Sequence, residues 1–190
     1  MACARLCVLT NPPRGLRHAR ERDTADMTSP LALGLVPSLR PGRVLDGGGR
    51  HAERSFLDFR VGDRLLGPLV ATRVRLADLA NDYVSALVTN WPAGFPAQAV
   101  MQLLGMEDSP LPDGRTPLYL CAECGGLGCG AVTSVIERDD DAVIWHSLGH
   151  QTDYDSFVDY EPFKDLGPYR FDITSYDATL RGLLAARIQP

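Results

Sequence analysis

Lysine and long apolar runs are what this sequence most lacks. Lys164 stands alone against eighteen arginines, and the 190 residues carry a formal net charge of −5. Nucleic-acid-binding surfaces need clustered basic side chains, so this balance argues against a nucleic-acid partner. No stretch of about 20 consecutive apolar residues is present, and the sequence therefore predicts neither a membrane-spanning helix nor a membrane partner.

Common catalytic and nucleotide-binding signatures are also missing. The chain has no Gly-x-Ser-x-Gly elbow, no Walker loop and no dinucleotide-binding fingerprint. Cysteine is sparse and uneven, because three of the five cysteines fall within nine residues: Cys121, Cys124 and Cys129. A secreted disulfide framework spreads its cysteines along the chain, so we expect a reducing, cytoplasmic environment instead.

Composition divides the chain into an extension and one domain. Residues 1–50 are rich in proline and mix arginine with acidic residues, without an apolar period beside them. Such a segment buries too little surface to offset its ordering entropy, so we expect residues 1–50 to be flexible or disordered. Residues 51–190 have the patterning of a single folded domain.

The folded region alternates strand and helix patterns. Period-two alternation predicts strands at 55–61, 83–88, 118–121, 130–138, 143–148 and 169–172. Helices are expected from Pro96 to Gly105 and from Thr174 onward, with a shorter one around Pro68. The pattern predicts an α+β fold in which two helices pack on one face of an antiparallel sheet with a central hairpin or meander.

The segment Cys121-Ala-Glu-Cys124-Gly-Gly-Leu-Gly-Cys129 is the main candidate for chemistry. Cys-x-x-Cys followed directly by glycine is typical of a zinc knuckle, whose tight turn brings two thiolates to one ion. Cys129 is close enough in sequence to be a third ligand. The alternative interpretation is that the cysteines are small buried apolar side chains at a strand end.

A tetrahedral zinc site needs a fourth ligand, and His146 and His150 are the candidates. On one strand they share a face about 13 Å apart, too far to bind one ion. A two-residue Asp139-Asp140 turn pairs Cys129 with His150, whereas pairing Cys129 with Gln151 turns His150 away. We therefore predict a zinc site made of Cys121, Cys124, Cys129 and His150.

Several functions follow from these residues. A closed four-ligand site would serve a structural role or the recognition of a protein or small-molecule partner. Three cysteine ligands alone would leave an open position that can activate water, as in a small hydrolytic or tailoring enzyme. A metal-free enzyme would use His150 with Asp153 or Asp155 as acid and base, although an acidic loop is more often a solvated surface.

A thiol redox protein is the remaining alternative. It would use a reducible Cys121–Cys124 disulfide. Such proteins place the motif at a helix N-terminus, whereas here glycines and another strand follow it.

Five segments resemble those of a known family: 55–58, 118–125, 128–133, 143–145 and 166–172. The most distinctive carries the motif C-x-E-C-G-x-L-G-C-G-A. Together they resemble a family of small, largely uncharacterised actinobacterial proteins, some labelled oxidoreductase, over roughly two thirds of the chain. The resemblance implies a fold that begins near Ser55 and a special role for the cysteine loop. Family members often carry an acidic residue at the position of Gly126, and the resemblance implies no substrate.

Overall fold

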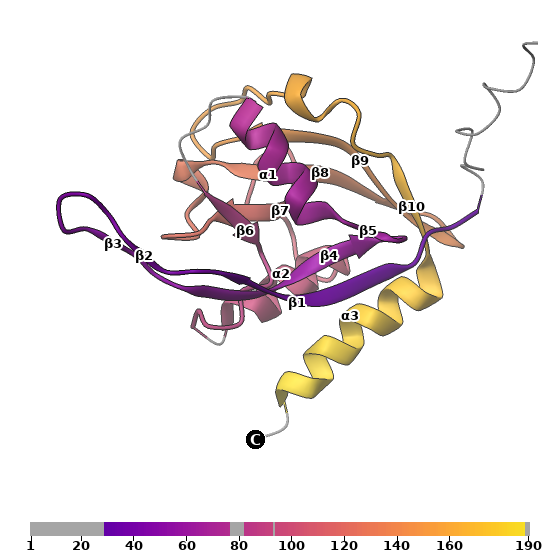
Figure 1. The fold of residues 1–190 in the computed structure, drawn as a ribbon. Helices are drawn as coiled ribbons and strands as arrows, with labels where there is room; N and C mark the ends of the chain where they lie inside the picture. The colour runs from indigo at the N-terminus through magenta and orange to yellow at the C-terminus, as the bar shows by residue number, and fades with distance from the viewer. Residues whose placement is uncertain (1–28, 77–81, 93, 189–190) are drawn as a thin grey trace, which may run out of the picture.

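The described chain begins with a long strand. The computed structural model describes residues 29–76, 82–92 and 94–188. Strand β1 (Leu33–Arg40) pairs antiparallel with β4 (Arg54–Val61) along its whole length. Between them, β2 (Arg43–Val44) and β3 (Arg50–His51) form a hairpin that extends away from the rest of the molecule (Figure 1).

The boundary expected at residue 51 is therefore corrected. Residues 1–28 lie outside the described residues, so an extension there stays a prediction. Residues 33–40, by contrast, form a paired strand, and Leu33 is buried in the core. Pro37 interrupts the strand signal in the sequence, yet it is tolerated because β1 is an edge strand of its sheet and an edge position can dispense with one N–H donor.

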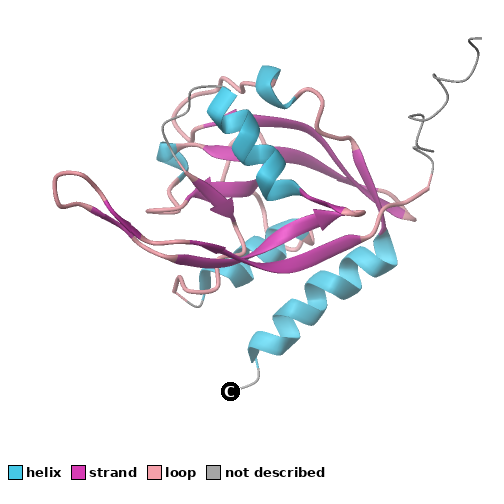
Figure 2. Cartoon of the chain, in the orientation of Figure 1, coloured by secondary structure: helices cyan, strands magenta, loops and turns pink. Residues whose placement is uncertain are grey.

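Besides the β2–β3 hairpin, the described residues form two antiparallel sheets, which confirm the predicted α+β class (Figure 2). The larger sheet contains, in spatial order, β10 (Tyr169–Asp172), β9 (Ala142–Gln151), β8 (Ala131–Arg138), β7 (Thr116–Cys121) and β6 (Tyr83–Ser85). The smaller sheet has the order β1, β4 and β5 (Arg64–Leu65). The central β8–β9 hairpin predicted from the sequence is present.

The two sheets are joined at both edges. Leu31, just before β1, forms a parallel bridge with Phe171 of β10. Phe56 of β4 forms an antiparallel bridge with Val88, just beyond β6. The backbone N–H of Leu57 reinforces this second junction by donating to a carbonyl of the same segment at 3.1 Å. The strands therefore form a ring around the core.

Three α-helices complete the fold of the described residues. The two expected helices are α2 (Gly94–Leu103) and α3 (Ile173–Ile188), and they contact each other. Helix α1 (Leu66–Leu76) is longer than the short helix expected around Pro68, and it packs apart from that pair, on β4 and β6 (Figure 1). No helix in the described ranges is both long enough and apolar enough to cross a membrane.

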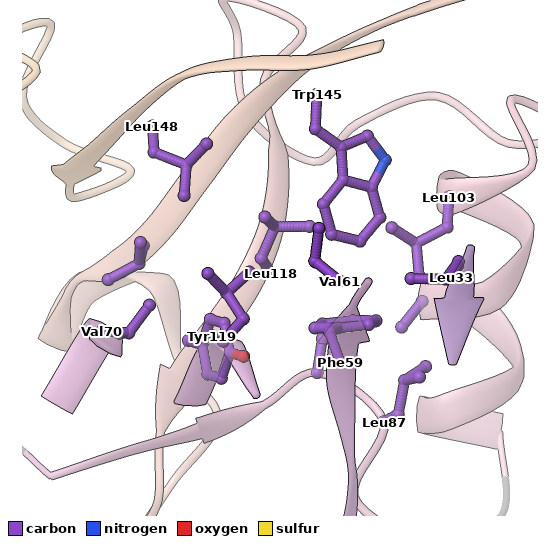
Figure 3. Close-up of a cluster of buried hydrophobic side chains, with 14 of the residues drawn as sticks. Leu33, Phe59, Val61, Val70, Leu87, Leu103, Leu118, Tyr119, Trp145 and Leu148 are labelled. Atoms are coloured by element: carbon purple, nitrogen blue, oxygen red, sulfur yellow. The ribbon is translucent and has the colours of Figure 1, made fainter. Parts of the chain in front are cut away.

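An aromatic group lies at the centre of the core (Figure 3). The rings of Phe59 and Trp145 meet edge to face with centroids 5.2 Å apart. Trp145 Nε1 donates to the hydroxyl of Tyr176 at 3.1 Å, and that hydroxyl donates to the carbonyl of Leu103 at 3.0 Å. Residues of both sheets and of helices α2 and α3 thus meet around one tryptophan, and burying each large side chain contributes about 1.5–3 kcal/mol.

A carboxyl group is buried in the same core. Asp58 is only 3% exposed, and its Oδ1 accepts hydrogen bonds from Tyr119 Oη at 2.7 Å and from the backbone N–H of Phe59 at 2.9 Å. Gly67, in the first turn of α1, lies so close that a Cβ there would be 2.3 Å from Asp58 Oδ2. The carboxyl therefore lies at the N-terminus of α1, where the helix dipole favours negative charge.

The β8–β9 hairpin contains a bulge that the sequence did not predict. Ser134 of β8 stands opposite two residues of β9, Ser147 and Leu148, and Ser147 has a φ of 53°. The buried Arg115 holds this bulge, because its guanidinium donates to the Thr133 hydroxyl at 2.9 Å and to the carbonyl of Ser147. The extra residue in β9 shifts the face of every side chain beyond it.

The turn and the bulge together correct two expectations about the histidines, because the hairpin turns at Asp140-Asp141 instead of Asp139-Asp140. His150 pairs with Val132, so the predicted pairing with Cys129 is wrong. Trp145 and Leu148 both face the core, which means that the alternation reverses between them. His146 and His150 consequently lie on opposite faces instead of sharing one.

Candidate metal centre

Three cysteines from one loop meet at the end of β7. Cys121 is the last residue of β7 and is buried, while Cys124 and Cys129 are exposed. Their sulfur atoms all lie within 4.8 Å of one another, and Cys124 Sγ is 3.4 Å from Cys129 Sγ. Among the described residues, no other group of three or more histidine, cysteine or acidic side chains gathers its ligand atoms in this way.

Glycines shape the loop. The N–H of Gly125 donates to the carbonyl of Cys121 at 2.9 Å, with a φ of 65° that favours glycine. A Cβ at Gly125 would also lie 2.8 Å from the Trp91 ring. The N–H of Gly126 then donates to Cys124 Sγ at 3.3 Å, so a backbone donor stabilises this sulfur atom. A short 3₁₀ turn (Leu127–Cys129) then brings Cys129 Sγ close to the sulfur atoms of Cys121 and Cys124.

The sulfur atoms differ in their affinity for protons. The hydrogen bond from the Gly126 N–H lowers the pKa of Cys124. The hydrogen bond with Cys124 raises the pKa of Cys129 to about 11, and repulsion by the neighbouring thiolates adds to this effect. Cys124 is therefore the first of these two to ionise, and a cation between them would relieve the repulsion.

Two arginines hold the loop from outside. Arg40 of β1 pairs with the carboxylate of Glu123 and also donates to Asp82 at 2.7 Å. Arg54 of β4 donates to the carbonyls of Ala122 at 2.6 Å and Glu123 at 2.9 Å. Glu123, the acidic residue inside the Cys-x-x-Cys motif, thus anchors the loop to the smaller sheet.

His150 lies beside the loop but outside the sulfur group. Its Nε2 is 2.8 Å from Tyr83 Oη, and Tyr83 Oη also donates to the carbonyl of Cys129 at 3.2 Å. Burial lowers the pKa of His150, and the charge of Asp159 opposes this effect. A Cβ at Gly130 would lie 2.2 Å from His150 Nε2, so the glycine allows the ring to fit against the loop. The structure does not bring His150 into the group of ligand atoms.

The proposed acid–base partners are not joined to His150. Asp153 and Asp155 are both exposed, and Asp155 Oδ1 accepts the N–H of Phe157 at 2.9 Å within its own loop. In the described part of the chain, no hydrogen bond or ion pair links either carboxylate to His150. On the side of β9 away from β8, His150 forms an isolated antiparallel bridge with Asp159 through two backbone hydrogen bonds of 2.9 and 2.8 Å.

A small apolar cavity borders the cysteine loop. It has a volume of about 160 Å³, and its walls come from α2, β7 and the loop itself. Its lining includes Phe95, Gln98, Ala99, Leu120, Gly125 and Leu127. Cavities of about this size can hold a benzene-sized group. The cysteine loop therefore has room beside it for a small ligand.

Sequence reasoning found the three cysteines but missed the residues that position them. Arg40 lies in a segment expected to be disordered, and nothing near Arg54 or Tyr83 in the sequence marks them as neighbours of the loop. Comparisons of the chain with protein-family models, curated proteins and solved structures found no match. The resemblance to the actinobacterial family accordingly stays a prediction.

Proposed function

We propose that this protein binds one zinc ion through Cys121, Cys124 and Cys129 and uses the fourth coordination position to recognise a ligand or partner. The close sulfur triad carries the proposal. Thiolates that share a tetrahedral zinc ion at Zn–S distances of about 2.3 Å lie about 3.8 Å from one another. Sulfur atoms within 4.8 Å, two of them 3.4 Å apart, need only small adjustments to reach that arrangement.

The surroundings of the triad support a metal ligand set. The Gly126 N–H already donates to Cys124 Sγ, which stabilises a thiolate. Arg40 and Arg54 together form a clamp: Arg40 pairs with Glu123 and Arg54 donates to the carbonyl of Ala122, so the backbone between Cys121 and Cys124 is fixed. Three thiolates are soft donors, and zinc is the common divalent ion that binds them in tetrahedral sites.

The fourth position favours a ligand from outside this group. His150 would have to leave Tyr83 Oη to reach the ion, and no other described side chain joins the sulfur group. Cys124 and Cys129 are exposed, so solvent and small molecules can approach from their side. The neighbouring apolar cavity supplies space for part of such a ligand.

Charge favours recognition over hydrolysis. Three thiolates more than neutralise the two positive charges of zinc, which weakens its ability to ionise a bound water. Catalytic zinc sites that activate water rely more on neutral histidines. The hydrolytic alternative would also need a general base, and the structure pairs His150 with a tyrosine rather than with Asp153 or Asp155.

Metal content tests the proposal. Protein purified without an affinity tag is expected to contain about one zinc per chain by elemental mass spectrometry, and serine at Cys121, Cys124 or Cys129 should remove it. Cys7→Ser is the matched control, because it removes a cysteine outside the loop and should keep the metal. A chain without metal that also fails to bind added Zn²⁺ contradicts the proposal.

A second variant addresses the fourth ligand. His150→Ala is expected to retain one zinc per chain, since the structure places this ring against Tyr83. With cobalt in place of zinc, the variant should have the same visible spectrum as the wild-type protein. Addition of a small thiol should change this spectrum, because the thiol binds at the fourth position. Loss of metal in His150→Ala would instead establish the four-ligand site predicted from the sequence.

A further inference from the structure

Two of the three loop cysteines are positioned to react with each other. Cys124 Sγ and Cys129 Sγ are 3.4 Å apart and both side chains are exposed, whereas Cys121 is buried with 4% of its surface exposed. A disulfide needs the sulfur atoms about 1.4 Å closer, at about 2.05 Å. Three of the four residues between the two cysteines are glycines, Gly125, Gly126 and Gly128, so the backbone can make this small movement.

The geometry points to a reversible Cys124–Cys129 disulfide that forms on exposure to hydroperoxides and competes with metal binding at the same loop. The disulfide itself depends only on the two thiols, while its effect on the metal rests on the proposed function. This pair differs from the Cys121–Cys124 disulfide that a redox interpretation of the motif predicts.

The chemistry balances with a hydroperoxide as oxidant. The Cys124 thiolate attacks one peroxide oxygen, the O–O bond breaks, and the leaving alkoxide or hydroxide takes a proton and departs as an alcohol or water. Cys124 is then a sulfenic acid. The Cys129 sulfur attacks it, the S–S bond forms, the S–O bond breaks, and the hydroxide leaves as water with the Cys129 proton. Two thiols lose two electrons and the peroxide gains them.

Cys121 is the less suitable partner. It ends a fully buried strand, and its neighbours Ala122 and Glu123 are fixed by the Arg54 guanidinium. Movement of Cys121 would disturb β7 and the hydrogen bonds of Arg54. Cys129, by contrast, ends a single 3₁₀ turn at the surface.

Oxidation would remove two of the three thiolates from a bound ion. A single remaining thiolate holds zinc weakly, so one ion should be released for each disulfide formed. Reduction by a dithiol would restore both thiols and the metal site. The loop would then bind its ligand only under reducing conditions.

Hydrogen peroxide with full-length protein tests the inference. Cys3→Ser and Cys7→Ser in the same chain leave only the three loop cysteines. After treatment, loss of the mass of two hydrogens and of two free thiols is expected. Digestion with trypsin and a glutamate-specific protease cuts after Glu123, which separates Cys121 from the other two. A Cys124–Cys129 disulfide leaves the Cys121 peptide unlinked.

Variants separate the disulfide from the metal. In Cys121→Ser, metal binding should be lost while the disulfide still forms, which makes the test independent of the proposed function. In Cys129→Ser, no disulfide should form and a sulfenic acid should be trapped at Cys124. Zinc-loaded protein with all three loop cysteines should release one Zn²⁺ per disulfide to a colorimetric indicator.

The outcomes are distinct. Disulfide formation in a chain that never binds zinc would support the redox pair and reject the metal site. Zinc binding without a disulfide at stoichiometric peroxide would reject this inference and leave the metal site standing. A Cys121–Cys124 linkage, or only disulfides between chains, would also overturn it.

Discussion

Among single residues, Asp58 shows most clearly how burial and hydrogen bonding compete. Burial raises the pKa of its carboxyl, while hydrogen bonds from Tyr119 and the backbone N–H groups of Phe59 and Gly67 act in the opposite direction. The net effect is a raised pKa. The native protein therefore retains this proton at a higher pH than the unfolded chain does.

The raised pKa predicts a specific pH dependence. Between the ordinary aspartate pKa of about 3.9 and the raised native value, the native state binds more protons, so the free energy of unfolding falls as pH rises. Asp58→Asn should remove the pH-dependent contribution of this carboxyl. The difference in the free energy of unfolding between the wild-type protein and the variant should change with pH across that window and level off above it. Urea unfolding at a series of pH values measures the difference. A difference that is constant with pH would contradict the assignment.

Residue chemistry also explains which part of the site could be predicted. The three cysteines lie within nine residues, so the local turn alone brings them together and the sequence pattern was sufficient. His150 is different, because its neighbours depend on the register of a hairpin. The turn lies at Asp140-Asp141 instead of Asp139-Asp140, and a bulge at Ser147 shifts the pairing by one more residue, which no local signal indicated.

At the level of elements, the cysteine loop depends on a strand distant in sequence. Arg40, at the end of β1, connects Glu123 of the loop with Asp82 and with the carbonyl of Ala52. Its side chain is 10% exposed, so these contacts are shielded from water more than those of a surface ion pair. The smaller sheet therefore supports the loop through one guanidinium.

Removing that guanidinium should loosen the loop. Arg40→Ala is expected to raise hydrogen-exchange rates over residues 122–130 and, if the loop binds zinc, to weaken the affinity by about 10- to 100-fold, as for other supports of metal ligands. Arg64→Ala is the matched control, because Arg64 is exposed on β5. Exchange measured by mass spectrometry checks the first effect, and competition with a chelator checks the second. Equal exchange in both variants would show that the clamp is dispensable.

Strand and helix positions were the most predictable elements. β4, β8, β10 and α2 follow local periodicity and stop signals, so their predicted bounds are close to the observed ones. β1 was missed because its stability comes from pairing with β4 and not from its own pattern. Gly34 and Pro37 interrupt the strand signal and hide an edge strand that only a partner can define.

For the whole molecule, the contribution of β1 can be tested by truncation. Deleting residues 1–41 removes the partner of β4 and the buried Leu33, and should abolish cooperative thermal unfolding. Deleting residues 1–28 should leave the melting temperature within a few degrees of the full chain, as expected for an extension. Thermal unfolding followed by the fluorescence of the buried Trp145 compares the two. A stable, cooperative 42–190 fragment would contradict the ring of strands.

The junction between Leu31 and Phe171 also affects how the protein is made. The ribosome synthesises β1 before every other strand of the ring and β10 after them, so the ring cannot close until β10 has emerged. Until then, the inner face around Phe59 has no cover from the last strand. During this interval the nascent chain exposes apolar surface, which makes it a natural client for the chaperones that bind apolar segments during translation.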